Sequence, residues 1–304
     1  MISFLLQRDT WQEIFSSIGK NKIRTGLTVV GVLWGIFVYI AMSGAAKGLD
    51  NGFERAFESV AKNSLFVFAQ STSKPYGGYK TGRRLSITLS DVETLKKRIA
   101  EIDIIAPRIV KGIFGGSPAL VVRGQNTGNY AVYGDYPEYT KIATKEIYQG
   151  GRYINDKDIE MSRKVCVIGE RTQKELFDAD ENPIGEYIRI DNVYFKVVGI
   201  HKFVPGGGFE NDSDVFIPFS TFKKLYNTGE KIGFMAIAAY DDADVIQVEK
   251  DVKAVLKAIH KVDPTDERAF ASFNLGEVFG QIMGFANGLS FLSLIIGIAT
   301  ILAG

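Results

Sequence analysis

Few residues in this sequence combine the type and the spacing that a chemical site requires. Asp178, Asp180 and Asn182 match the first half of a calcium-binding loop, in which alternate side chains supply oxygen ligands. Pro183 stands where such a loop needs glycine, and Arg189 stands where it needs the closing glutamate. We therefore interpret these residues as a surface turn.

The other candidate residues lack partners of a suitable type. Asp212 and Asp214 could contact a cation, but aspartates are mostly exposed in proteins, and we expect a solvated loop. Cys166 lies in a short apolar run, which predicts a buried and unreactive thiol. His201 and His260 have no evident partner in the sequence. We assign no catalytic role to any residue.

Composition and motifs exclude several classes of function. A single Cys and two His rule out zinc sites built on several thiolates and multi-histidine metal sites. The phosphate-loop pattern is missing, and Gly206 to Gly208 are only a glycine run in a mobile loop. The 36 basic and 35 acidic residues balance, so nothing indicates a nucleic-acid partner. We expect no cofactor in this chain.

The apolar residues concentrate at the two ends of the sequence, which predicts two membrane spans. Thr25 to Ala46 and Ile282 to Gly304 contain no charged residue. As a helix the first segment would extend ~33 Å, enough to cross a hydrocarbon core of ~30 Å. The sequence stops inside the second segment, and we expect it to be the N-terminal fragment of a longer membrane protein.

Basic residues at the membrane edge predict the topology. Lys20, Lys22 and Arg24 precede the first span, which favours a cytoplasmic N-terminus. The region 47–281 is nearly neutral and is expected outside the cytoplasm. The alternative is a cleaved signal peptide with Ser43-Gly44-Ala45 at its end, but its apolar region would be much longer than usual. Residues 1–20 fit an interfacial helix, or else a frayed N-terminus.

The middle of the sequence predicts an α+β domain. The helical period of the first span continues to Val60, so we expect a helix over 21–60 that projects as a stalk. Strand and helix patterns then occur at each end of the middle region: a strand at 63–70, a helix opened by a capping box at Ser90–Glu93, a strand at 102–114 interrupted at Pro107, a strand at 233–240, a helix at 241–261 and a strand at 269–274.

These two sets of elements can share one sheet, with residues 115–231 inserted between them. We expect one α+β subdomain from 61–114 and 232–274, and an inserted β-rich subdomain. The inserted part holds strand patterns at 119–123, 130–133, 164–168, 187–190 and 193–200, a hairpin turn at Asp191-Asn192, and helices at 171–177 and from a Ser220 cap to Tyr226.

Glycines recur at four-residue spacing beside both spans, where a bare backbone stripe lets another helix approach closely. The stripes consist of Gly44, Gly48 and Gly52 after the first span and of Gly276, Gly280, Gly284 and Gly288 at the start of the second. We predict a helix–helix contact between them; the alternative is loose packing or local flexibility.

Asn21 to Val32 (NKIRTGLTVVGV) resembles the entry to the first transmembrane helix of MacB/FtsX-type ABC transporter permeases. Similar segments follow in the order that this family has: Ile104 to Pro107, Gly150 to Tyr153 with Asp158, Val167 to Gly169, Leu176-Phe177, Pro183 to Gly185, Phe195 to Ile200, Ile217-Pro218 and Ser220-Thr221. The resemblance covers essentially the whole chain.

The resemblance implies a dimeric permease in the bacterial inner membrane, with four membrane helices and a large periplasmic domain after the first. That domain would comprise a porter-like part and the insertion, and 275–304 would form a stalk and the second, truncated membrane helix. A separate cytoplasmic ABC ATPase would hydrolyse ATP, and the movement would reach the periplasm to expel substrate. A second permease of the same or another kind, a periplasmic adaptor and an outer-membrane channel are further partners that the resemblance implies.

A second function stays open on the sequence. The chain could be a membrane-tethered periplasmic binding or sensor module without ATPase coupling. Two further spans downstream would favour the permease, and a cytoplasmic signalling domain would favour the sensor.

Overall fold

The computed structural model describes residues 22–303 except 114–115 and 204–209. The chain divides into two compact units, one made of residues 1–54 with 280–304 and the other of Arg55–Phe279. The predicted interfacial helix at 1–20 and the glycine run at 206–208 lie outside the described residues.

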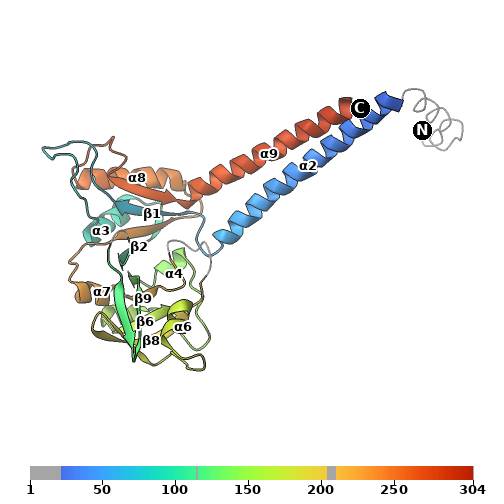
Figure 1. Cartoon of the computed structure of the whole chain (residues 1–304). Helices are drawn as coiled ribbons and strands as arrows, with labels where there is room; N and C mark the ends of the chain where they lie inside the picture. The colour runs from blue at the N-terminus through green and yellow to red at the C-terminus, as the bar shows by residue number, and fades with distance from the viewer. Residues whose placement is uncertain (1–21, 114–115, 204–209, 304) are drawn as a thin grey trace. The chain divides into compact units, whose positions relative to one another are not determined.

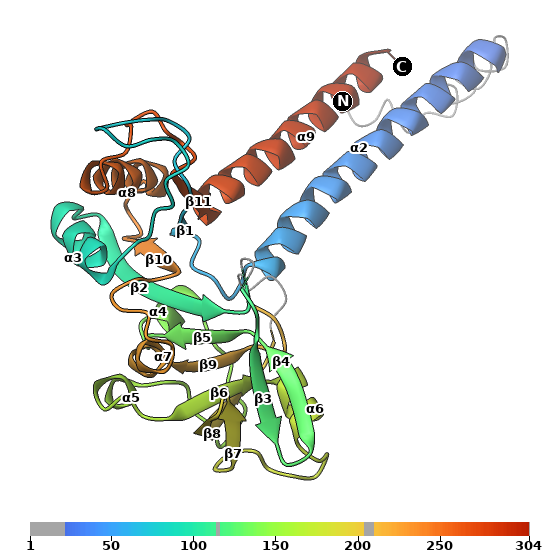
Figure 2. The same cartoon turned by 60° about the vertical axis from the view of Figure 1, so that its left-hand side comes forward.

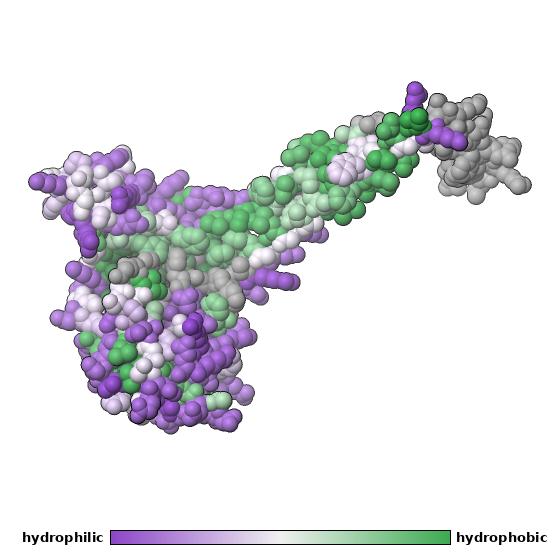
Figure 3. All heavy atoms as spheres, in the orientation of Figure 1, coloured by the Kyte–Doolittle hydropathy of each residue, from purple (hydrophilic) through white to green (hydrophobic). Residues whose placement is uncertain are grey.

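Two long helices account for the predicted membrane spans. Helix α2 covers Lys22–Ala56 and helix α9 covers Leu275–Ala303. Both are long and apolar enough to cross a membrane, and only 11% of the most apolar window of each is buried. Apolar atoms cover their surface, unlike the surface of the domain (Figure 3). Helix α2 ends four residues before the predicted Val60, because a turn follows at 57–59.

The second unit is built on a sheet of 11 strands in the order β11-β1-β10-β2-β5-β9-β6-β8-β7-β3-β4 (Figures 1 and 2). The first four are β11 (Phe270–Asn274), β1 (Ser64–Ala69), β10 (Phe234–Ala239) and β2 (Ile102–Lys111). The other seven are β5 (Val132–Asp135), β9 (Val215–Pro218), β6 (Val165–Gly169), β8 (Val193–His201), β7 (Tyr187–Ile190), β3 (Ala119–Arg123) and β4 (Asn126–Tyr130).

Strands from the predicted insertion and strands from the segments on either side of it belong to one sheet. The first four strands come from residues 61–114 and 232–274, and the other seven from 115–231. Strand β2 links the sets, because its first part pairs with β10 and Ile109 to Lys111 pair with β5. Whether the sets behave as separate subdomains stays a prediction.

Strand β2 runs through Pro107 without a break, so the predicted interruption is wrong. The carbonyl oxygen of Arg108 accepts a hydrogen bond from the Gly233 N–H of the strand next to it. The backbone N–H and C=O positions of residue 108 therefore point toward β10, and those of residue 107 point toward the other neighbouring strand, β5. Strand β5 begins to pair with β2 only at Ile109, so position 107 has no strand partner on that side. The missing N–H of proline thus removes no bond between β2 and β10.

Helices cover both faces of the sheet. Helix α8 (Val245–Ile259) packs on β11 and β1, and α3 (Leu89–Arg98) packs on β2 and on α8. The short helix α4 (Tyr139–Ile142) contacts β10 and β2. Around the inserted strands lie α5 (Asp156–Glu160), α6 (Glu170–Leu176) and α7 (Phe219–Tyr226). All six residues of β10 are buried, as a central strand with both faces covered requires.

Two predicted helix caps are wrong, and the hairpin turn is confirmed. Helix α3 is capped by Thr88, which forms a capping box with Asp91 rather than the predicted one from Ser90. The Ser220 hydroxyl caps nothing and donates instead to the Ile159 carbonyl oxygen. Asp191 and Asn192 both have positive φ, 41° and 72°, as a tight turn between β7 and β8 needs.

The strand predicted at 130–133 is also placed differently. The chain instead forms β4, which ends at Tyr130, and β5, which starts at Val132. Gly128 lies in β4, and the side chain of Tyr130 occupies the space that a Cβ at this glycine would fill. Strand β4 has the sequence NTGNY and lacks alternating apolar residues, so the sequence pattern did not predict it.

Candidate functional site

A cluster of buried charges lies where β2 passes from one set of strands to the other. Arg108 in β2 and Asp135 in β5 are both completely buried. The guanidinium is bidentate to the carboxylate, with Nε at 2.5 Å from Oδ1 and Nη2 at 2.6 Å from Oδ2. The Tyr153 hydroxyl donates to the same Oδ2 at 2.7 Å. Such paired geometry is what allows ions to stay in a protein interior.

Two further charges complete this cluster. Glu210 Oε1 lies 2.7 Å from Arg108 Nη1, and its other oxygen forms an ion pair with Lys145. The Lys145 and Glu210 side chains are only 7% and 5% exposed. The Tyr139 ring lies against the guanidinium, with its centre 3.6 Å from Arg108 Cζ. We call Arg108, Asp135, Lys145, Tyr153 and Glu210 the buried ion cluster.

Each buried cation of the buried ion cluster pairs with a buried carboxylate. Burial acts to lower the pKa of Arg108, but the Asp135 carboxylate reverses the effect, and the pKa is raised overall. Burial and the Arg108 charge lower the pKa of Lys145 to about 7, whereas the Asp135 and Asp214 carboxylates act to raise it. Burial also raises the pKa of Tyr153 well above its ordinary value, so this tyrosine is a hydrogen-bond donor. These groups hold strands and loops together.

A second polar arrangement lies where the sheet continues into α9. Strand β11 ends at Asn274 and α9 begins at Leu275, with no residue between them. The Asn274 amide donates to Glu249 Oε2 of α8 at 2.7 Å and to the Val245 carbonyl oxygen at 3.3 Å. Its own oxygen accepts the Glu277 N–H at 3.1 Å. This side chain thus ties β11, α8 and the first turn of α9 together, and we call it the α9 joint.

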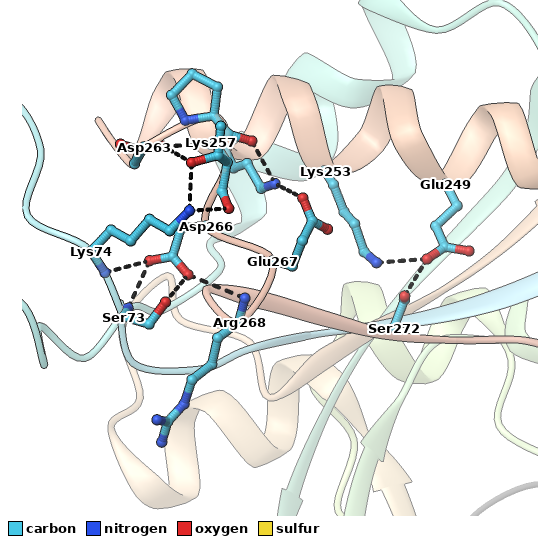
Figure 4. A network of polar contacts seen from close by, with 12 residues as sticks. Ser73, Lys74, Glu249, Lys253, Lys257, Asp263, Asp266, Glu267, Arg268 and Ser272 are labelled. Atoms are coloured by element: carbon cyan, nitrogen blue, oxygen red, sulfur yellow. Dashed lines mark hydrogen bonds and ion pairs between the residues drawn. The ribbon is translucent and has the colours of Figure 1, made fainter.

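The α9 joint is reinforced from both sides. Ser272 of β11 donates to Glu249, and the Lys253 ammonium lies 2.6 Å from the same carboxylate (Figure 4). Burial would raise the pKa of Glu249, but hydrogen bonds from Lys253, Ser272 and Asn274 lower it overall. A Cβ on Gly276 would lie 2.4 Å from Val245 Cγ1, so glycine permits the close contact with α8.

The sequence-predicted candidates each have their own surroundings in the structure. Cys166 is buried in β6, as predicted, and burial raises the pKa of its thiol. Asp214 is 1% exposed, so the predicted solvated loop is wrong at this position. Burial raises the pKa of Asp214 to about 6, and the carboxylate accepts the Asn211 N–H at 2.7 Å.

The two histidines have different surroundings. His201 is buried edge-on against Phe216, and burial lowers its pKa to about 4. His260 has a partner that the sequence did not indicate: its Nε2 lies 3.0 Å from Asp91 Oδ2. Asp91 accepts the N–H of the N-cap Thr88 in the capping box of α3, so this contact joins the start of α3 to the end of α8. The role of Asp91 was not recognised, because the cap was expected two residues later, at Ser90.

The calcium-like residues form no ligand set. The Asn182 side chain accepts the Ile184 N–H at 3.1 Å, which is the geometry of a turn. Among residues 22–303 outside the two undescribed segments, no group of three or more His, Cys, Asp or Glu could hold a metal ion.

Of the seven glycines in the predicted stripes, only Gly276 makes a close contact in the described chain, and its neighbour is Val245 of α8 rather than the other stripe. A Cβ on any of six of these glycines would meet nothing within 4 Å: Gly44, Gly48, Gly52, Gly280, Gly284 and Gly288. Within the unit of the two chain ends, the close approach is instead at Gly35, where a Cβ would lie 2.1 Å from Thr300 Oγ1. The stripe contact stays a prediction. Lys22 and Arg24 are exposed at the start of α2, and Lys20 lies outside the described residues.

Sequence patterns missed the buried ion cluster and the α9 joint. Arg108 follows the apolar run Ile104 to Pro107, and Asp135 ends the buried strand β5. A charge inside a buried strand pattern is the available signal, since buried charges need partners. The two acidic partners of Arg108 lie 27 and 102 residues away and cannot be paired with it from one sequence.

Comparison with known proteins identifies the class. The model of the MacB-like periplasmic core domain matches residues 25–255. The chain therefore belongs to the family of MacB-like periplasmic core domains.

Curated relatives agree along most of the chain. The macrolide export ATP-binding/permease protein MacB of Bdellovibrio bacteriovorus is 26% identical over 298 residues, which is 95% of this chain and 44% of the relative. The pyoverdine export ATP-binding/permease protein PvdT of Pseudomonas syringae pv. syringae is 26% identical over 266 residues, 83% of this chain and 38% of the relative. The chain spans less than half the length of these relatives.

Solved structures agree on the fold. The periplasmic region of MacB from Actinobacillus actinomycetemcomitans has a TM-score of 0.58 at 22% sequence identity. The match covers 74% of this chain and 94% of the MacB chain. The extracellular domain of the transporter YknZ from Gram-positive bacteria has a TM-score of 0.55 at 17% sequence identity, and the match covers 70% of this chain and 100% of the YknZ chain. The predicted α+β fold is confirmed, and the two end helices are long and apolar enough to span a membrane.

Proposed function

We propose that this chain is the permease subunit of an ABC transporter. It would transmit an ATP-driven movement of its membrane helices to the periplasmic domain, which then expels substrate. The observation that carries the proposal is the α9 joint, where a sheet strand becomes a membrane helix without a linker.

The two strands that connect to the long helices α2 and α9 lie side by side at one edge of the sheet. Strands β1 and β11 are antiparallel neighbours, and Leu65 pairs with Asn274. Strand β1 follows α2 after a short turn, and α9 follows β11 directly. A change in the spacing or rotation of the two membrane helices would therefore act on adjacent strands. Hydrogen-bonded strands do not slide freely, so the force would move the sheet as a body.

The buried ion cluster supports transmission beyond the first four strands. Arg108 belongs to β2, and its partner Asp135 belongs to β5 of the other set. A bidentate and fully buried ion pair resists separation, because either ion left alone would be buried without compensation. The first four strands and the inserted segment would thus move together.

The partners and the location follow from the same proposal. A separate cytoplasmic ABC ATPase would supply the energy, and a second permease, identical or not, would complete the membrane part. We place the N-terminus in the cytoplasm and residues 47–281 in the periplasm, on the strength of Lys20, Lys22 and Arg24. A periplasmic adaptor and an outer-membrane channel would carry the substrate onward. The glycine stripes would offer close-packing faces to neighbouring helices.

The test is a flexible insertion at the α9 joint. Three glycines between Asn274 and Leu275, in the full-length permease with its ATPase, should leave ATP hydrolysis intact and reduce export severely. The matched control carries the same insertion in the exposed turn at 178–181. Export by the joint variant equal to that of the control would refute transmission through the joint.

Topology has its own test. With Cys166 replaced, a cysteine at Asp178 should react with an impermeant reagent in intact spheroplasts, and a cysteine at Ser3 should not. The reverse labelling pattern would overturn the orientation.

A further inference from the structure

A groove of about 830 Å³ runs along the outer face of α8. Its lining includes Lys250, Lys253 and Lys257, which share one side of the helix, and Lys261, which follows the end of α8. This volume lies in the range of sites that bind small organic molecules. Neither the buried ion cluster nor any motif in the sequence accounts for it.

The floor of the groove between the lysines is apolar. Ala254 and Ala258 lie exposed on the same face of α8, and Ile246 is 39% exposed at one end. Lys250 lies within α8, and Lys261 follows the C-cap His260, so the two lysines stand toward opposite ends of the groove. The groove therefore offers two cationic ends and an apolar middle.

The lysines differ in whether a protein carboxylate already neutralises them. Lys253 pairs with Glu249 at 2.6 Å, and Lys257 pairs with Glu267 at 2.8 Å (Figure 4). In the part of the chain that the structure describes, the ammonium groups of Lys250 and Lys261 have no hydrogen-bond or ion-pair partner, although the Lys261 carbonyl oxygen accepts a hydrogen bond from Arg83. The two ends of the groove thus carry uncompensated positive charge.

The rim opposite α8 is fixed before any ligand arrives. The loop from Ser71 to Arg84 contributes Tyr76 to the groove. Asp266, fully buried, accepts the Ser73 N–H at 2.7 Å and the Ser73 hydroxyl at 2.6 Å, and Arg83 donates to the His260 carbonyl oxygen at 2.5 Å. A preformed groove binds with less loss of conformational entropy than one that must be ordered.

We propose that the α8 groove is a binding site for an elongated organic anion, with acidic groups at its ends and an apolar middle. The end groups contact the Lys250 and Lys261 ammonium groups, and the apolar part lies on Ala254 and Ala258. The glutamates of the lining disfavour a fully charged chain, which is why the apolar middle matters. The site is independent of the transport proposal.

The experiment is a calorimetric titration of the full chain in phosphatidylcholine nanodiscs with α,ω-dicarboxylates of increasing length, from succinate to tetradecanedioate. Empty nanodiscs and the diamine 1,12-diaminododecane serve as controls. We expect saturable binding of one long dicarboxylate per chain, weakened by salt, with succinate and the diamine not bound. Lys250→Gln and Lys261→Gln should each weaken binding about threefold to fivefold, as the loss of one exposed ion pair would.

The double variant should lose measurable binding, and the exposed Lys174→Gln of α6 should leave it unchanged. Circular dichroism checks that each variant is folded, which is expected because Lys250 and Lys261 are exposed. Equal binding of the diamine, unchanged binding by the double variant, or no binding of any dicarboxylate up to its solubility limit would each overturn the site.

Discussion

The buried ion cluster around Arg108 and the lysine groove on α8 use the same residue types in opposite ways. In the cluster, Arg108 and Asp135 are fully buried and satisfy each other. In the groove, the ammonium groups of Lys250 and Lys261 are exposed and have no partner among the described residues, while Lys253 and Lys257 pair with glutamates. Desolvated charges must be matched inside the protein, and exposed charges need not be.

This difference separates residues that hold the domain together from residues that are free to bind. Removing a member of the cluster leaves an uncompensated ion in the interior. Removing an open lysine leaves nothing unsatisfied. Stability measurements on the domain Arg55–Phe279 can therefore sort the two groups, and this segment forms a compact unit by itself.

The largest expected effect is that of Arg108→Ala. The substitution leaves Asp135 and Glu210 buried without their guanidinium and should lower the free energy of unfolding by about 3–5 kcal/mol. Urea denaturation of the isolated domain measures it. Arg171→Ala, at an exposed pair with Glu175, is the matched control and should not move the midpoint. A loss no greater than in the control would mean that the cluster does not hold the strands together.

The next effect is a pair of opposed pH dependences. Burial lowers the pKa of His201 to about 4, so the unfolded chain gains its proton first as the pH falls below about 6.5, and stability is lost. Burial raises the pKa of Asp214 to about 6, so the folded domain gains that proton first, and stability is gained as the pH falls from 6. Each contribution amounts to about 3 kcal/mol at its limit.

Thermal unfolding between pH 7 and pH 4.5 separates the two groups. Relative to the unmodified domain, His201→Gln should gain stability toward low pH and Asp214→Asn should lose it. Parallel profiles for all three proteins would show that neither side chain titrates differently in the folded state.

A smaller loss is expected for Asn274→Ala at the α9 joint. Glu249 loses a donor at 2.7 Å and the Glu277 N–H loses its acceptor, so unfolding should become easier by about 1–3 kcal/mol. The exposed Asn129→Ala of β4 is the control. Equal denaturation midpoints for the two variants would remove the joint from the account of how β11 and α8 are held.

The smallest effect is expected for the open lysines. Lys250→Gln and Lys261→Gln should shift the free energy of unfolding by less than about 0.5 kcal/mol, because surface substitutions away from buried features rarely do more. The same urea titration measures it. A loss near that of Arg108→Ala would show that these ammonium groups are structural and would end the comparison between cluster and groove.

The sequence predicted elements far better than contacts. Local patterns suffice for the apolar spans, for β7 and β8 around Asp191-Asn192, and for the period of α8, because these depend on neighbouring residues. Local patterns fail where residues distant in the sequence determine the structure. Pro107 fits into β2 because β5 begins to pair only at Ile109. The Asp91 carboxylate contacts both the Thr88 N–H and the His260 ring, and His260 is 169 residues away. Arg108, Glu210 and Asn274 belong to the second kind, which is why the site was missed.

The most direct test of the central claim is hydrogen exchange in the full-length permease with its ATPase, without nucleotide and with ATP trapped. If the membrane helices act on the sheet through the α9 joint, amides of β1 and β11 should change their exchange between the two states. The insertion of three glycines between Asn274 and Leu275 should abolish that change while ATP hydrolysis continues. Exchange that is identical in both states, or a difference that survives the insertion, would contradict transmission through the joint.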